Sequence, residues 1–447
     1  MPSTKIVCTL GPSTDGVLAA LVRAGMSVAR VNFSHGTHED HARRIAAVRA
    51  HDGVAIVGDL QGPKWRIGEA AIDLSAGDEV VLGAGGIPLP HPDLIADVEI
   101  GQRLLLDDGN IELRVEGKRA GALVCRTVAG GPLTSRKGVS APESRLSIAC
   151  PTEKDLRDAE FAAECGLDYL ALSFVRSAAD IERLRARVDV PIVAKIEKRQ
   201  ALDAFDEILA AADAVMVARG DLGVETPAEE VPIRQKEIIL ACNRAGKPVI
   251  TATQMLQSMV ASPRPTRAEA SDVANAILDG TDAVMLSAET ATGAYPVESV
   301  ATAARIAVNA EAHLESRVGE LRAVDDTGAI AEATVEMAAE LGARAIVTAT
   351  MSGHTARMVA RYRPRVPILA VTPSEAVRRR LALVWGVRPW AAASIDGTDE
   401  MIRAAERAVL DAGLAVAGDR IVLTAGIPFG GAGKTNFLKV HVVGTGA

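Results

Sequence analysis

The feature that most restricts the fold is a regular alternation of short apolar runs with helical stretches, interrupted once and then resumed. Three strand-like runs precede the interruption and five follow it. Parallel strands joined by helical crossovers form a sheet covered by helices, and eight of them can close into a barrel. We therefore predict a (β/α)₈ TIM barrel with strands at 5–10, 27–33, 54–59, 169–174, 192–195, 214–217, 249–252 and 283–286.

The composition agrees with this fold class. Hydrophobic residues make up 48% of the 447 residues, but aromatic residues only 3%. Cores must therefore be built from Ala, Val, Ile and Leu, which favours parallel strands buried on both faces.

The interruption and the C-terminal region predict two further domains. From 66 to 147 the chain is rich in glycine and alternates like short strands between turns, which indicates a small β domain inserted after the third barrel strand. From 326 onward, helices and strands alternate again. We expect a barrel from 1–65 and 148–325, the inserted β domain from 66–147 and an α/β domain from 326–447.

Charge and targeting signals restrict the partners. The formal net charge of −8 argues against a general nucleic-acid or anionic-membrane binder. The five cysteines are odd in number and form no Cys-x-x-Cys pair, which fits reduced thiols. We find no signal peptide and no long apolar run, and therefore expect a cytoplasmic protein.

The chemistry is expected where two neighbouring strands end. Alternation along 191–197 directs Lys195 and Glu197 to the same side, and Asp221 is expected in a glycine turn after the next strand. Two carboxylates with few other ligands suit Mg²⁺, and a lysine beside the metal suits a phosphoryl group in transfer. An ordinary ion pair at a barrel rim is the alternative for Lys195 and Glu197.

Other polar residues also lie at predicted strand ends, where barrel enzymes carry their active sites. They are Arg30, Asn32, Asp59, Ser173, Thr253 and Ser287.

Four motifs in this order resemble those of pyruvate kinases: Lys195-Ile-Glu197, the run 219–225 (RGDLGVE), the run 251–259 (TATQMLQSM) and the run 285–290 (MLSAET). The resemblance extends from Lys5 almost to the C-terminus. It implies transfer of a phosphoryl group from phosphoenolpyruvate to ADP, giving pyruvate and ATP, the last step of glycolysis. It also implies Mg²⁺ or Mn²⁺ as cofactor, and it implies that the inserted domain is a small β-barrel lid that closes over the site. An effector site in the C-terminal domain and a homotetramer are further implications.

The resemblance assigns roles residue by residue. Glu197 and Asp221 match the divalent metal ligands, Lys195 the lysine that neutralises the phosphoryl in flight, and Thr253 the threonine associated with enolate protonation through water. The remaining matches are Arg30 and Arg66 for substrate phosphate, the backbone amides of Gly220 and Asp221 and the residue Ser287 for substrate, and Asn32, His35, Arg66 and Lys137 for nucleotide.

One departure from the family pattern concerns the monovalent cation. Asn32, Ser34 and Asp59 match residues of a K⁺ pocket, but Lys64 stands where most members have glutamate. The exchange changes the local charge by two units, and the ammonium could replace the ion and repel it. We therefore predict that K⁺ is not required. The alternative is that Lys64 turns to solvent and K⁺ is still needed.

A second phosphate site is predicted in the C-terminal domain. The loop 348–355 leads from a strand into a helix and carries Thr350, Ser352, Gly353, His354 and Thr355. Hydroxyls and amides at a helix start suit phosphate, and the resemblance implies a sugar-phosphate or AMP effector here. Simple helix capping by Ser352 or Thr355 is nearly as good an explanation.

Two other functions compete with the kinase. A related Mg²⁺ barrel could be a lyase acting on oxaloacetate-like acids, although such lyases lack the lid, the C-terminal domain and a lysine placed like Lys195. A ligand-sensing homologue without activity would be expected to have lost Lys195, Glu197 or Asp221, and all three are present.

Overall fold

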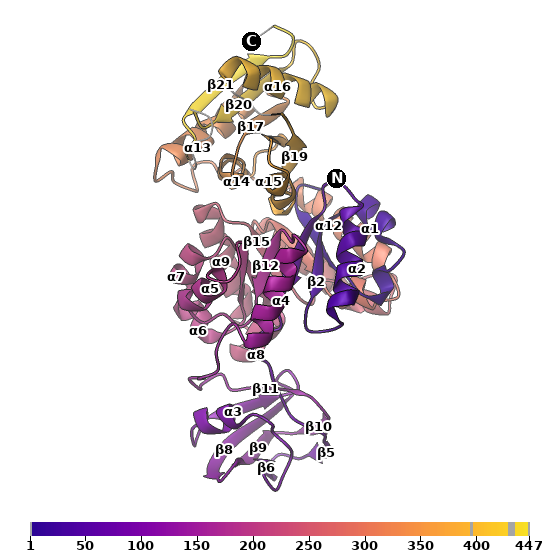
Figure 1. Cartoon of the computed structure of the whole chain (residues 1–447), viewed down its shortest axis with the longest axis vertical. Coiled ribbons are helices and arrows are strands. Elements are labelled where there is room, and N and C mark those ends of the chain that lie inside the picture. The colour runs from indigo at the N-terminus through magenta and orange to yellow at the C-terminus, as the bar shows by residue number, and fades with distance from the viewer. Residues whose placement is uncertain (1, 394–396, 428–433, 446–447) are drawn as a thin grey trace.

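The computed structural model describes residues 2–393, 397–427 and 434–445. Three units follow one another along the long axis of the molecule, with the barrel in the middle, the lid at one end and the C-terminal domain at the other (Figure 1). The lid and the C-terminal domain therefore contact opposite ends of the barrel.

The predicted barrel of eight parallel strands is confirmed. Each strand pairs with its neighbour in chain order, and the last pairs with the first, so the sheet has no edge. Its strands are β1 (Lys5–Thr9), β2 (Met26–Asn32), β3 (Ala55–Asp59), β12 (Tyr169–Leu172), β13 (Ile192–Ile196), β14 (Ala214–Ala218), β15 (Val249–Ala252) and β16 (Ala283–Leu286).

The barrel interior is filled by small and branched side chains, as the composition predicts. Val7, Val28, Val57 and Met216 are among the residues packed inside, all with at most 2% exposure. Leu383 of the C-terminal domain belongs to the same cluster, so that domain closes one end of the barrel. The opposite end of the barrel, which faces the lid, is not covered by this domain (Figure 1).

Helices and short turns surround the barrel. Three of these helices begin with threonine capping boxes, Thr37 for α2, Thr152 for α4 and Thr266 for α10, because each threonine accepts a hydrogen bond from the third residue of its helix. The helices are α1 (Leu18–Ala24), α2 (His38–Arg49), α4 (Glu153–Glu164), α5 (Ala178–Arg185), α6 (Arg199–Asp203), α7 (Phe205–Ala211), α8 (Arg219–Glu225), α9 (Val231–Ala245), α10 (Arg267–Leu278), α11 (Ala288–Ala291) and α12 (Pro296–Glu311), with 3-10 turns η1 (Pro12–Thr14) and η2 (Gln257–Val260).

One local expectation was wrong. The segment with Asp221 is not a glycine turn but helix α8, so Asp221 lies in the first turn of a helix.

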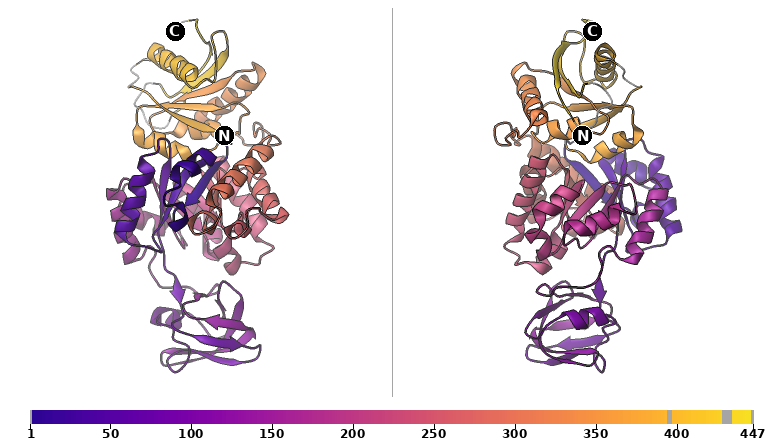
Figure 2. Two further views of the ribbon diagram at one scale, coloured as in Figure 1. Left: turned by 90° about the vertical axis from the view of Figure 1, so that its right-hand side faces the viewer. Right: turned by 60° about the vertical axis from the view of Figure 1, so that its left-hand side comes forward.

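The lid is an antiparallel β domain, as predicted. A six-stranded sheet in the order β4-β11-β7-β8-β9-β6 packs with a two-stranded sheet of β5 and β10 around its own apolar core. Both views of Figure 2 show it joined to the barrel through a narrow connection. Its elements are β4 (Trp65–Arg66), β5 (Ala71–Leu74), β6 (Glu79–Gly83), α3 (Pro92–Asp97), β7 (Arg103–Leu106), β8 (Ile111–Arg119), β9 (Ala122–Ala129), β10 (Gly131–Thr134) and β11 (Gly138–Ser140).

The C-terminal domain is a five-stranded mixed sheet with helices. Only the last strand runs antiparallel, and the strand order is β19-β18-β17-β20-β21. The elements are α13 (Asp326–Glu340), β17 (Ala345–Ala349), α14 (His354–Ala360), β18 (Ile368–Thr372), α15 (Glu375–Arg380), η3 (Leu381–Leu383), β19 (Val387–Ala391), α16 (Thr398–Asp411), β20 (Arg420–Ala425) and β21 (Phe437–Val442).

Ion pairs attach this domain to the barrel. Arg378 of α15 pairs with Asp52, and Arg379 pairs with the buried Asp168 at 2.9 Å. Lys5 of β1 donates a hydrogen bond to the carbonyl of Val387 at 2.7 Å. On the barrel side these three contacts involve different loops and strands, so the domain is attached to the barrel at several points.

Two further expectations concern cysteines and membranes. All five cysteines are free, and all but the partly exposed Cys165 are buried, as expected for reduced thiols. Within the described ranges, none of the helices has the length and apolar character needed to cross a membrane.

Candidate active site

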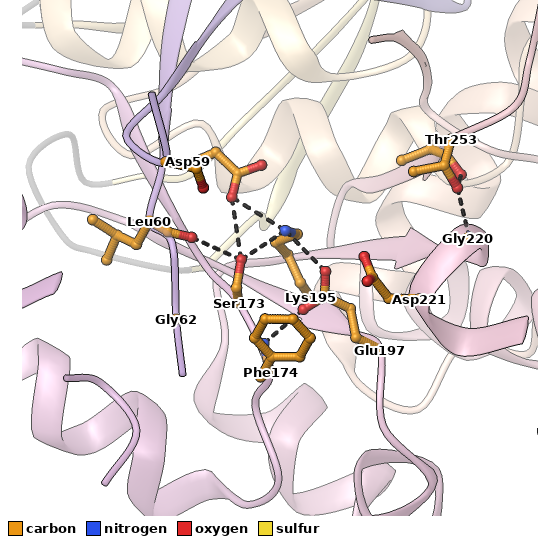
Figure 3. Close-up of polar contacts among 12 residues, drawn as sticks. Asp59, Leu60, Gly62, Ser173, Phe174, Lys195, Glu197, Gly220, Asp221 and Thr253 are labelled. Carbon is orange, nitrogen blue, oxygen red and sulfur yellow. Dashed lines mark hydrogen bonds and ion pairs between the residues drawn. The ribbon is translucent and has the colours of Figure 1, made fainter. Parts of the chain in front are cut away.

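The polar residues predicted at strand ends gather at the barrel end that faces the lid. Lys195 is the centre of the group, and its ammonium reaches residues from three strands and the loops after them (Figure 3). Its Nζ lies 2.9 Å from Oε1 of Glu197 and 3.2 Å from Oδ1 of Asp59, and it donates to Oγ of Ser173 at 2.7 Å. The predicted meeting of Lys195 and Glu197 is thus confirmed.

The charge of Lys195 is set by its neighbours. Burial opposes the charged ammonium, but the carboxylates of Asp59 and Glu197 outweigh burial and raise the pKa of Lys195 above its ordinary value. The ammonium therefore stays protonated at neutral pH and provides a fixed positive charge at the centre of the site.

Arg30 and Asp59 form a second ion pair beside it. Nε of Arg30 lies 2.6 Å from Oδ2 of Asp59, and a terminal guanidinium nitrogen donates to Oγ1 of Thr9 at 3.0 Å. Burial opposes the ionisation of Asp59, but the charges of Arg30 and Lys195 outweigh it and lower the pKa of Asp59. The carboxylate of Asp59 therefore pairs with two cationic side chains, those of Arg30 and Lys195.

Glu197 and Asp221 are the carboxylates that could hold a divalent metal. Oε2 of Glu197 accepts a hydrogen bond from the backbone N–H of Phe174 at 2.6 Å, which fixes the carboxylate. Burial raises the pKa of Glu197; Lys195 opposes this effect, and the nearby charge of Asp221 adds to it. Both carboxylates line one small cleft of about 40 Å³, together with Lys64 and Asp108. Two carboxylates in an open cleft fit Mg²⁺, which retains waters and binds substrate oxygens.

Lys64 lies next to Asp221. Its Nζ is 3.7 Å from Oδ1 of Asp221, and both side chains are about one-third exposed, at 32% and 35%. Asp59 of the predicted K⁺ pocket is paired instead with Arg30 and Lys195. The ammonium of Lys64 thus adds its charge on the Asp221 side of the site and does not turn away into solvent.

Thr253 is held in a strained conformation over helix α8. Its φ is +70° and that of Gln254 is +55°, values that residues other than glycine seldom adopt. Oγ1 of Thr253 accepts a hydrogen bond from the N–H of Gly220 at 2.7 Å, and Arg219 donates to the carbonyl of Thr253 at 2.8 Å. Arg219 is in turn paired with Asp272 at 2.6 Å, so Thr253 is fixed from two sides.

Two predicted phosphate-binding residues come from the lid. Arg66 lies in β4, where its guanidinium donates to the carbonyl of Arg136 at 2.9 Å. Lys137, just before β11, pairs with Asp107 at 2.6 Å. Neither residue contacts the Lys195 cluster, so both depend on the position of the lid to reach a ligand on the barrel.

The remaining predicted residues follow β2 and β16. Asn32 pairs in register with Asp59, and its side-chain oxygen accepts from the N–H of Ser34 at 3.1 Å. His35 follows in the same turn, with its N–H bonded to the carbonyl of Asn32. The N–H of Ser287 donates to the buried Glu289 at 2.7 Å. These residues surround the same barrel end without contacting Lys195 directly.

The predicted effector loop stands apart in the C-terminal domain. The N-cap of α14 is Gly353, whose φ is +79°, and no side chain caps the helix. Oγ1 of Thr350 accepts from the N–H of Gly353, and the Thr355 hydroxyl shares a hydrogen bond with Thr435 at 2.9 Å. Gly353, rather than Ser352 or Thr355, is therefore the N-cap residue of α14, although Ser352 accepts a hydrogen bond from the N–H of His354, the first residue of this helix, at 3.4 Å.

The sequence-based interpretation missed several residues that shape the site. They include Lys198, Glu225, Ser140 and Glu289, which are charged or hydroxyl groups lying within long motifs or at the lid exit. Lys198 follows Glu197 directly and Glu225 closes the RGDLGVE run, so their proximity in sequence to predicted site residues was the available signal.

Comparisons with known proteins identify the family of this arrangement. The family model described as the pyruvate kinase barrel domain matches residues 1–300, and the model of the pyruvate kinase alpha/beta domain matches residues 328–441. Pyruvate kinase of Geobacillus stearothermophilus is 50% identical over 470 residues, covering 98% of this chain and 80% of the relative. Those of Bacillus licheniformis and Agrobacterium vitis are each 46% identical, covering 99% and 98% of this chain and 81% and 98% of the relatives.

Proposed function

The chain belongs to the pyruvate kinase family, and from that premise we propose how its own residues divide the work of the reaction. The reaction transfers the phosphoryl group of phosphoenolpyruvate to ADP and yields pyruvate and ATP. The lyase and the inactive-sensor alternatives do not fit, since the lid and the C-terminal domain are present and Lys195, Glu197 and Asp221 meet at one site.

The observation that carries the assignment of roles is the buried cluster around Lys195. Phosphoryl transfer requires positioned positive charge more than covalent chemistry. Lys195 and Arg30 supply two such charges, and both are oriented by the single carboxylate of Asp59. We assign Lys195 to the phosphoryl group in transfer and Arg30 to the substrate phosphate.

Glu197 and Asp221 are assigned to the divalent metal. When bound, Mg²⁺ or Mn²⁺ would act as a Lewis acid toward the substrate carboxylate and enolate oxygen. The hydrogen bond from Phe174 orients Glu197 for this role, and the N–H groups of Gly220 and Asp221, in the first turn of α8, are suited to hold the substrate carboxylate.

Thr253 is assigned to the protonation of the enolate. The strained backbone directs its hydroxyl into the region above Gly220, where it already contacts the N–H of that residue. A threonine hydroxyl is too weak an acid to act alone, so a bound water would deliver the proton. Ser287 lies after the next strand of the barrel and is assigned to substrate binding.

The nucleotide is assigned to residues on both sides of the cleft. Arg66 and Lys137 would approach its phosphates from the lid, and Asn32 and His35 from the turn after β2. Closure of the lid would bring the two groups together and exclude water, which strengthens every charge interaction inside.

We further propose that this enzyme does not need K⁺. Lys64 already supplies a positive charge 3.7 Å from Asp221, and Asp59 already has two cationic partners. A monovalent cation bound by Asn32, Ser34 and Asp59 would therefore be repelled rather than required.

The C-terminal domain is assigned to regulation. The loop with Thr350, Ser352, Gly353, His354 and Thr355 offers N–H groups and hydroxyls, and no side chain caps the helix after it. A sugar phosphate or AMP would bind to these groups.

A homotetramer is the expected assembly, and light scattering after gel filtration would measure it.

A coupled assay tests the activity. Pyruvate formation from phosphoenolpyruvate and ADP is followed with Mg²⁺, with and without K⁺ and with and without sugar phosphates or AMP. Activity that requires both substrates and Mg²⁺ is the expected result. Absence of pyruvate under all of these conditions would contradict the proposal.

A further inference from the structure

A buried ion pair lies where the lid leaves the barrel, and the reaction scheme above does not use it. Nζ of Lys198 is 2.5 Å from Oε1 of Glu225, and the two side chains are only 5% and 2% exposed. Lys198 follows the metal ligand Glu197, whereas Glu225 ends helix α8. The pair thus joins the two barrel segments that carry the proposed metal ligands.

The lid contacts this pair through one hydroxyl. Ser140 in β11 donates a hydrogen bond to Oε1 of Glu225, and its Oγ lies 3.4 Å from Nζ of Lys198. The second oxygen of Glu225 is buried and has no hydrogen-bond partner in the structure. A single carboxylate oxygen therefore holds both the barrel lysine and the lid serine.

The same lysine also lies over the entering strand of the lid. Its Nζ is 6.0 Å from the ring centre of Trp65 and 5.5 Å from that of Phe174, within the range of cation–π attraction. Trp65 in β4 pairs in register with Val139 in β11, so the two connecting strands form one ladder. The ion pair of Lys198 and Glu225 therefore contacts both strands that connect the lid to the barrel, β11 through Ser140 and β4 through Trp65.

Stability alone gives a weak reason for this arrangement. A buried ion pair must lose its hydration, and replacing it by apolar groups is often neutral or favourable. The pair does fix the direction of two lid strands. These are β11, which directly follows Lys137, and β4, which contains Arg66. Both residues reach a ligand only as far as the position of the lid allows.

We propose that Lys198 and Glu225 are positioning residues that anchor the lid through Ser140 and so set where Arg66 and Lys137 meet the nucleotide. The inference rests on the nucleotide roles proposed above for these two residues. It gives a function to three side chains that the proposed reaction does not use, although they line the same cleft as Glu197 and Asp221. In this proposal the pair holds the lid to the barrel at this point through Ser140.

The test removes only the contribution of the lid. Ser140→Ala deletes the hydroxyl and leaves the ion pair intact, and Ser140→Thr should restore the contact. Arg185→Met is the matched control, because it breaks the ion pair with Asp213 at the opposite end of the barrel. A double variant, Lys198→Met with Glu225→Gln, removes both charges together and so avoids leaving one buried charge unpaired.

Two readouts separate the anchor from the nucleotide roles. Hydrogen exchange of the free full-length protein, followed by mass spectrometry on peptides spanning 60–68 and 137–148, reports opening of the connecting strands. Steady-state kinetics give KM for ADP and for phosphoenolpyruvate separately. In Ser140→Ala we expect exchange in these peptides and KM for ADP both to rise about tenfold, as for loss of one hydrogen bond to a charged acceptor. KM for phosphoenolpyruvate should change less than about twofold, since its barrel ligands are untouched.

The outcomes decide separately whether the lid is anchored by this pair and whether Arg66 and Lys137 contact the nucleotide. Unchanged exchange in both Ser140→Ala and the double variant would overturn the anchor. Faster exchange with an unchanged KM for ADP would support the anchor but overturn the nucleotide roles of Arg66 and Lys137. Equal effects in Arg185→Met would show a general loss of stability and would also overturn the proposal, whereas recovery in Ser140→Thr would support it.

Discussion

Reversing the charge of Lys64 is the sharpest test of K⁺ independence. Its ammonium lies 3.7 Å from Asp221, where unit charges attract by about 1 kcal/mol in water and about 4 kcal/mol at an effective dielectric constant of 20. Both side chains are about one-third exposed, so solvent screening favours the lower value. Lys64→Glu turns this attraction into repulsion, which changes the interaction free energy by at least about 2 kcal/mol.

A change of about 2 kcal/mol corresponds to roughly a thirtyfold loss of activity, since 1.4 kcal/mol is a factor of ten. We expect Lys64→Glu to lose about this much activity in tetramethylammonium salts and to recover most of it in K⁺, which would bind near the new carboxylate. The wild-type protein should be equally active in both. The assay is initial-rate pyruvate formation at saturating Mg²⁺ and constant ionic strength.

Two controls accompany this experiment. Lys64→Met removes the positive charge without adding a negative one and should lose less activity than Lys64→Glu. Lys118→Glu makes the same charge change on the exposed lid strand β8, away from the cleft, and should behave like wild type. A wild-type enzyme that needs K⁺, or a Lys64→Glu variant that remains fully active without it, would refute the reasoning.

Three further variants test the barrel residues. Lys195→Met should lower kcat at least about a hundredfold and change KM for phosphoenolpyruvate much less, because its charge acts on the group in transfer; equal losses in both parameters would contradict this role. Thr253→Ala should slow exchange of the methyl protons of pyruvate with D₂O about a hundredfold, measured by NMR, and unchanged exchange would remove Thr253 from enolate protonation. Asp59→Asn should reduce the free energy of unfolding by about 3 kcal/mol at pH 7, because it leaves Arg30 and Lys195 without their shared anion. Since the pKa of Asp59 is lowered in the fold, its ionised form stabilises the protein above the unfolded pKa of about 4, and this stabilisation is lost as pH falls through the folded pKa. The difference between wild type and Asp59→Asn should therefore shrink below about pH 4, and a difference independent of pH would contradict the assigned cause.

Contacts between predicted site residues could be foreseen from the sequence where the residues are close together in the chain. Lys195 and Glu197 are two positions apart at the end of one strand, so their common direction follows from the geometry of a strand. The error at Asp221 has a similarly local origin. Two glycines in the run 219–225 indicated a turn, but tertiary packing of the buried Leu222 and Glu225 stabilises this segment as helix α8.

The sequence by itself determined the eight barrel strands, the presence of an inserted β domain and a C-terminal α/β domain, and the set of polar residues at the barrel strand ends. These follow from short-range periodicity, because burial on both faces of a parallel strand demands a continuous apolar run. Only the tertiary structure decided which charges become partners. Closure of the barrel brings Arg30, Asp59 and Lys195 together from three strands, and attachment of the lid brings Ser140 to Glu225, 85 positions away. Such pairings depend on strand order, register and domain docking, which are set by the free energy of packing the whole chain rather than by any one segment.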